Sequence, residues 1–212
     1  MTKQQGIKLS QRAAAEKYLI QGYGATGDWK AAICYREAIR HLKKEAKLRK
    51  HSFCGTLRRR DLTQHLMYLN RSYRERDKAV SLMKRAIDNG HDLAVMHDAF
   101  YCMDRAEVYF RLDPCMTTEN RRELAAQVLE RIERAYELGF APAAYMLSII
   151  YRDGYHDIEA DAEKAEHYHA NFEELRRGSK RQAALSVHLP VTKKDEPGTH
   201  QLDYYSWIQW LL

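Results

Sequence analysis

The feature that most constrains the fold is a pair of helix-forming segments between residues 139 and 177. Small and large apolar residues recur at helical spacing through residues 141–151. A glycine-containing turn follows at Gly154, and Asp161 is a suitable N-terminal cap for a second helix, expected from about 161 to 177. Two short helices joined by such a turn predict an αα-hairpin.

This hairpin resembles the Sel-one-like repeat, a relative of the tetratricopeptide repeat. The family pattern is roughly G-x-A-x-A-x-Y-x-L-G-x-x-Y-x-x-G followed by D-x-x-K-A-x-x-W-Y. The residues in register are Gly139, Ala141, Ala143, Tyr145, Leu147, Tyr151, Gly154, Asp161, Lys164, Ala165 and Tyr168. Ser148 replaces a usual glycine, and residues 155–157 replace the usual G-V. The resemblance implies an all-α, right-handed superhelix of stacked αα-hairpins with a binding role.

Three other segments carry weaker copies of the second-helix pattern. The four copies begin at Lys30, Lys78, Gln127 and Lys164, in steps of 48, 49 and 37 residues. The two longer steps predict insertions at about residues 48–60 and 104–118. Residues 61–73 are then expected to form a separate helix before the copy at Lys78. The complete pattern predicts about eight helices stacked as a solenoid.

The chain divides into four regions by composition. Residues 1–11 are a polar N-terminal arm, and residues 12–177 are the expected helical-repeat solenoid. Residues 178–203 contain glycine, proline and charged residues, which predicts an irregular linker. Residues 204–212 are mostly large and apolar, so we expect them to be ordered rather than exposed to water.

The apolar segment 204–212 has two expected destinations. Terminal repeats need a cap, so it can fold back over the last hairpin. Alternatively, it can insert into a partner, with Trp207 and Trp210 as anchors. We favour the cap, because large exposed side chains promote aggregation.

Composition limits the class of protein. Apolar residues make up 45% of the 212, enough for a continuous core. No apolar run is long enough to cross a bilayer and no secretory signal is evident, which favours a cytoplasmic protein without a membrane partner. Cys34, Cys54, Cys102 and Cys115 are expected to be free thiols. A zinc site using Cys102, Cys115, His91 or His97 is a weaker alternative, because the spacings fit no common template.

Positive charge is concentrated between residues 40 and 60. This segment holds nine Lys and Arg side chains and one acid, Glu45, a net charge of +8, whereas the whole chain carries +6. Three interpretations remain open: a site for an acidic protein, a solvated helix face with its loop, or a site for nucleic-acid phosphates. The candidate cations are Arg40, Lys43, Lys44, Lys47, Arg58, Arg59 and Arg60.

Catalytic and cofactor motifs are weak in this sequence. Residues 22–27 match G-x-G-x-x-G, but that fingerprint requires a preceding strand and the preceding segment has helical spacing. We therefore interpret it as a turn between helices, with a dinucleotide site as the alternative. His167 and His169 point about 200° apart on a helix and cannot share one ion. We predict no cofactor and no metal, and find no nucleophile–base pair with motif support.

These observations favour a non-catalytic adaptor or regulator that binds a protein or peptide, which is acidic if the basic segment takes part. The family resemblance adds bacterial signalling and toxin or effector systems as settings. The alternative is a nucleic-acid-associated protein acting through residues 40–60. An enzyme with a site assembled from scattered residues is a third hypothesis.

Overall fold

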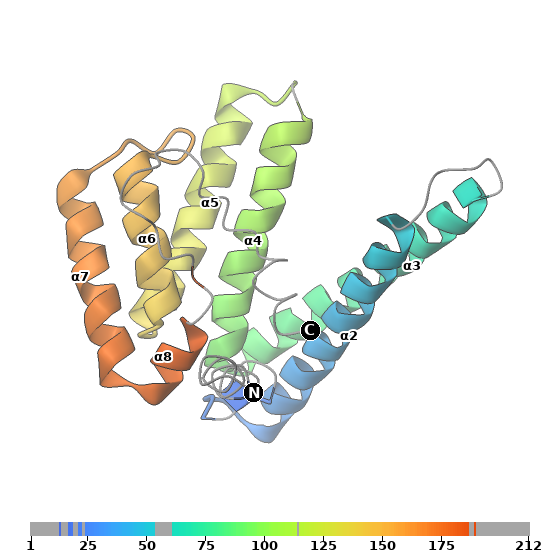
Figure 1. The fold of residues 1–212 in the computed structure, drawn as a ribbon, viewed down its shortest axis with the longest axis horizontal. Coiled ribbons are helices and arrows are strands. Elements are labelled where there is room, and N and C mark those ends of the chain that lie inside the picture. Colours follow the sequence, from blue (N-terminus) through green and yellow to red (C-terminus); the bar gives the residue numbers. More distant parts are fainter. Residues whose placement is uncertain are drawn as a thin grey trace, which may run out of the picture. The chain divides into compact units, whose positions relative to one another are not determined.

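The computed structural model describes residues 13, 17–18, 21–22, 24–53, 61–113, 115–186 and 189, and these residues are overwhelmingly helical (Figure 1). The helices are α2 (Trp29–Phe53), α3 (Asp61–Asp88), α4 (Asp92–Leu112), α5 (Thr118–Glu137), α6 (Ala141–Asp153), α7 (Ala162–Gly178) and α8 (Lys180–Leu185). No strand occurs within these ranges, where only an isolated bridge joins Tyr155 to Ile158. The all-α prediction is confirmed. None of the described helices combines the length and apolar character needed to cross a membrane.

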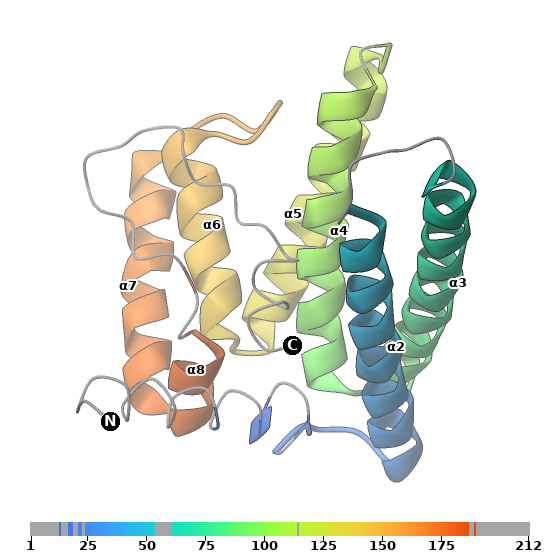
Figure 2. The same cartoon turned by 45° about the vertical axis from the view of Figure 1, so that its right-hand side comes forward.

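The helices fall into two compact units that divide within α4. One unit contains α2, α3 and the start of α4 up to Ala94, and the other continues from Val95 to α8. In Figures 1 and 2, α2 and α3 run side by side as one long hairpin, and α6 and α7 run side by side as a shorter one.

The α2–α3 hairpin forms because each helix has one apolar face. Asp28 caps α2 by accepting a hydrogen bond from the backbone N–H of Ala31 at 2.8 Å. The buried face of α2 comprises Ala31, Tyr35, Ala38 and Leu42, and that of α3 comprises Ser72, Ala79, Met83 and Ala86. These residues are spaced by three, four or seven positions, so each set lies along one side of its helix.

One expected boundary inside the first half of the chain is wrong. Helix α3 is continuous from Asp61 to Asp88, with no break between residues 73 and 78. No glycine or proline occurs within it, and its buried face continues through Ser72 and Ala79. Helix α4 runs to Leu112, so most of the segment 104–118, where an insertion is expected, is helical. The expected break between a helix at 61–73 and the copy beginning at Lys78 is therefore absent.

The α6–α7 hairpin matches its sequence prediction closely. Asp161 caps α7 by accepting a hydrogen bond from the N–H of Lys164 at 3.0 Å. The rings of Tyr145 on α6 and Phe172 on α7 lie 5.1 Å apart in the core of the hairpin. Every residue of α6 from Ala141 to Tyr151 is buried, which explains its small and apolar composition.

The beginning of the expected irregular linker is a short helix. Ser179 caps α8, and the side-chain oxygen of Gln182 accepts a hydrogen bond from the buried N–H of Ala141 at 3.0 Å. Leu189 is buried in the core formed by α6 and α7. The linker prediction missed these contacts because they join segments distant in the sequence. The apolar segment 204–212 lies outside the described residues.

Candidate partner-binding surface

The described cations of the predicted site all lie on α2. Arg40, Lys44 and Lys47 are exposed, and Lys43 is half-buried. The remaining predicted site residues, Arg58, Arg59, Arg60, Trp207 and Trp210, lie outside the part of the chain that the structure describes.

Three of the four cations belong to one longitudinal row on α2. We call this row the α2 seam; it comprises Trp29, Ile33, Arg36, Arg40, Lys43 and Lys47. The spacing alternates between four and three residues, which keeps the side chains on one side of a helix. The seam lies roughly half a turn from the face that packs on α3 and is about 27 Å long at the usual helical rise.

The apolar end of the seam is exposed. Trp29 is 69% exposed and Ile33 is 44% exposed. Arg36 and Arg40 follow on the exposed side of α2, one and two turns further along. The seam thus changes from apolar at the N-terminal end of α2 to cationic over the remainder.

Ion pairing leaves most of the seam's positive charge available. Arg40 lies 2.7 Å from Glu37, but both side chains are exposed, so water screens the pair and its contribution is small. Lys43 and Lys47 make no ion pair with any acid among the described residues. Lys44 points to α3 instead, where its ammonium lies 3.9 Å from Glu75.

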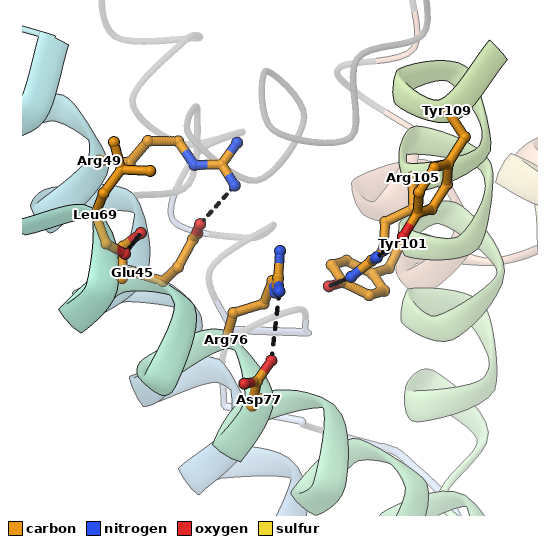
Figure 3. Close-up of polar contacts among 9 residues, drawn as sticks. Glu45, Arg49, Leu69, Arg76, Asp77, Tyr101, Arg105 and Tyr109 are labelled. Atoms are coloured by element: carbon orange, nitrogen blue, oxygen red, sulfur yellow. Dashed lines mark hydrogen bonds and ion pairs between the residues drawn. The ribbon is translucent and has the colours of Figure 1, made fainter. Parts of the chain in front are cut away.

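The single acid of the basic segment does not face the seam. Glu45 is fully buried, and its carboxylate lies 2.9 Å from the guanidinium of Arg49 one turn later (Figure 3). The negative charge of Glu45 therefore offsets Arg49 rather than the exposed cations. Counting charges along the sequence treats Glu45 as a neutralising neighbour of the seam, and the structure corrects this.

Glu75 on α3 links the two helices of the hairpin. Its Oε2 atom lies 2.5 Å from Nδ1 of His41, and Lys78 lies 3.5 Å from Oε1. The hydrogen bond with His41 is the main cause that lowers the pKa of Glu75, and the charges of His41, Lys78 and Lys44 add to it against the opposing effect of burial. These contacts stabilise the hairpin and lie apart from the seam.

Two arginines outside α2 are engaged with neighbouring rings or acids. On α3, the guanidinium of Arg76 lies 4.8 Å from the ring of Tyr73. It also lies 3.5 Å from the carboxylate of Asp77 (Figure 3). On α4, Arg105 donates hydrogen bonds to the hydroxyls of Tyr101 and Tyr109. These two arginines are engaged locally, whereas no ion pair joins Lys43 or Lys47 to an acid among the described residues.

In the glycine-rich segment 22–27, the described residues Thr26 and Gly27 pack against the end of the first hairpin. Gly27 has a φ of 101°, and a Cβ atom there would lie 3.1 Å from both the carbonyl oxygen of Asn89 and the carbonyl carbon of Gly90. The N–H of Thr26 donates a hydrogen bond to Asp92 at 3.1 Å. These contacts account for the glycine at position 27 by packing against the turn that follows α3.

The zinc alternative finds no support in the described ranges. No three His, Cys, Asp or Glu side chains there lie close enough to hold an ion. His91 stacks on Tyr35, with ring centroids 4.2 Å apart. Cys34, Cys102 and Cys115 are free thiols, and Cys54 is outside the described residues.

Sequence reasoning missed half of the seam. Trp29, Ile33 and Arg36 precede the window of high charge and were not assigned to the site. A signal was present, because the alternating spacing of four and three residues begins at Trp29 and continues through Lys47. A search by helical face rather than by charge density finds it.

Comparison with known proteins found no relative of this chain. No protein-family model, no curated protein and no solved structure matches this chain.

Proposed function

We propose that this chain is a non-catalytic helical-repeat adaptor or regulator, of the Sel-one-like and tetratricopeptide-like kind, that binds an acidic protein or peptide. The α2 seam is its binding surface. The observation that supports the proposal is the row of cations from Arg36 to Lys47, of which only Lys43 is half-buried and the others are exposed. This row continues from exposed Trp29 and Ile33.

The seam residues are not part of the buried apolar face of the hairpin. The apolar contacts between α2 and α3 use the opposite face of α2. Like charges four residues apart, as at Arg36 and Arg40 or at Lys43 and Lys47, destabilise a helix by about 0.2–0.5 kcal/mol per pair. An arrangement that costs stability in the free protein is expected where a partner of opposite charge relieves the repulsion.

Nucleic acid is the second candidate. A row of cations on one helix face can neutralise successive phosphates. The seam also begins with Ile33 beside Trp29, and an aliphatic side chain suits a protein partner better than a phosphate backbone. This favours the protein partner.

Charge reversal tests the proposal. Binding of the full chain to poly-L-glutamate, duplex DNA and single-stranded DNA is measured over a salt series. We expect poly-L-glutamate to bind, and Lys43→Glu/Lys47→Glu to weaken it about tenfold, given about 0.2–1 kcal/mol for each lost pair and added repulsion. The matched control is Arg122→Glu/Arg177→Glu, which makes the same change in net charge at exposed positions of the other unit.

Two results would contradict the proposal. Equal weakening by both double variants reduces the effect to net charge and contradicts a site on α2. Binding to DNA but not to poly-L-glutamate supports the nucleic-acid candidate instead. Circular dichroism of both variants verifies that the helices remain.

A further inference from the structure

We infer that the occupant of the α2 seam is one acidic amphipathic helix of a partner, which lies lengthwise on α2. Its apolar end contacts Trp29 and Ile33, and its carboxylates face the cations from Arg36 to Lys47. This inference rests on the proposed function and specifies the partner of the same surface.

The spacing of the seam indicates a helical partner. Positions 29, 33, 36, 40, 43 and 47 follow the alternation of four and three residues that marks the a and d positions of a heptad repeat. Side chains at that spacing form a nearly straight row that a second helix can follow. An extended peptide alternates its side chains between two faces and presents only every second residue to one surface.

Charge complementarity identifies the chemistry of this helix. The seam presents four cations in succession after its two apolar residues. A helix with Glu or Asp on its facing side pairs with them, because opposite charges are complementary across an interface. Its apolar end removes Trp29 from water, and a large aromatic side chain of this kind commonly anchors an interface.

The change from apolar to cationic side chains along the seam also predicts the direction of the partner helix. Acidic side chains stabilise the N-terminal part of a helix, because they complement its macrodipole. The acidic half of the partner is therefore its N-terminal half, and it faces the C-terminal part of α2 near Lys47. The apolar half then faces Trp29, so the two helices run antiparallel.

Three synthetic peptides of one composition test this inference against the full chain. Each has about 18 residues, matching the length of the seam at 1.5 Å per residue. The antiparallel peptide carries Glu at the heptad positions of its N-terminal half and Leu at those of its C-terminal half. The parallel peptide reverses this order. The scattered peptide distributes the same residues around the helix.

Affinities are measured by fluorescence anisotropy of labelled peptide, with duplex DNA as a fourth probe. We expect the antiparallel peptide to bind tightest and the scattered peptide to bind about tenfold more weakly or worse. Lys43→Glu/Lys47→Glu and Trp29→Ala each weaken the antiparallel peptide, whereas Arg122→Glu/Arg177→Glu does not.

Each of the other outcomes contradicts one part of the inference. Equal affinity for the antiparallel and scattered peptides overturns the helical partner, while the proposed acidic-partner function stands. Tighter binding of the parallel peptide overturns the predicted direction. Binding of DNA alone, with poly-L-glutamate also unbound, overturns both this inference and the proposed function.

Discussion

The α2–α3 and α6–α7 hairpins begin their helices in the same way but differ in net charge. Both begin a helix with a capping aspartate, Asp28 before α2 and Asp161 before α7. Residues 29–88 contain 17 Lys and Arg against six Asp and Glu, a net charge of +11. Residues 141–178 contain four against eight, a net charge of −4. The strong positive charge of the chain therefore belongs to the α2–α3 hairpin.

The difference follows from how many faces of each helix are covered. Helix α6 packs with α5, α7 and α8, and all its residues from Ala141 to Tyr151 are buried. Helix α2 packs on α3 through one face and keeps the seam exposed. A helix covered on all sides is constrained in composition by packing, whereas an exposed face is free to carry a binding pattern.

The largest predicted difference between the hairpins concerns their aromatic residues. Phe172→Ala removes a ring buried against Tyr145, so we expect the free energy of unfolding to fall by about 3–5 kcal/mol. Tyr73→Ala on α3 removes a ring that is 41% exposed and is expected to cost under about 1 kcal/mol. Urea unfolding compares the two; equal losses contradict the assignment of buried and exposed faces.

A smaller effect is expected where α8 supports the second hairpin. Gln182→Ala leaves the buried N–H of Ala141 without its acceptor, at a cost of about 1–3 kcal/mol. Lys180→Ala on the same short helix removes an exposed side chain and serves as the control. Thermal unfolding compares the stability of Gln182→Ala with that of Lys180→Ala. If they are equally stable, the contact from α8 to α6 does not contribute.

The helix caps are expected to behave alike in both hairpins. Asp28→Ala and Asp161→Ala each remove a carboxylate that accepts a backbone hydrogen bond in the first turn, at about 0.5–2 kcal/mol. Asparagine retains an acceptor oxygen, so Asp28→Asn and Asp161→Asn are expected to recover most of the loss in chemical denaturation. Failure of asparagine to do so at either site assigns the effect to charge and not to capping.

The smallest effect is a pH dependence confined to the first hairpin. The pKa of Glu75 lies below its usual 4.5, chiefly because of the hydrogen bond with His41. A lowered pKa adds stability above the unfolded pKa, and this contribution disappears as the pH falls through the folded pKa. Between about pH 5 and pH 3, wild type is therefore expected to lose more stability than Glu75→Gln, by under about 1 kcal/mol. Identical acid unfolding curves for the wild type and Glu75→Gln would contradict a stabilising role for the Glu75 carboxylate.

Sequence patterns predicted the second hairpin well because its signals are local. Glycines bound α6, Asp161 caps α7, and small residues mark the contacts between the helices. The first hairpin was harder to predict. Asp77 before Lys78 has the form of a helix start, yet α3 continues because Ser72 and Ala79 share one buried face and no helix breaker separates them.

The short helix α8 and the seam were missed for different reasons. Helix α8 depends on the contact of Gln182 with Ala141, 41 residues away, and no local pattern indicates such a contact. The charge near Lys43 and Lys47 was evident from composition, but burial of Glu45 was not. Whether a charged residue faces water or a neighbouring helix depends on tertiary packing, so charge density located the region and not its face.

The measurement that tests the central claim most directly is hydroxyl-radical footprinting of the full chain with the antiparallel peptide. Trp29 and Ile33 are 69% and 44% exposed, and both are expected to lose reactivity when the peptide binds. Tyr109 and Leu138 in the other unit are 45% and 49% exposed and are expected to keep theirs. Protection of Tyr109 or Leu138 with Trp29 unchanged would contradict the assignment of the α2 seam as the binding surface.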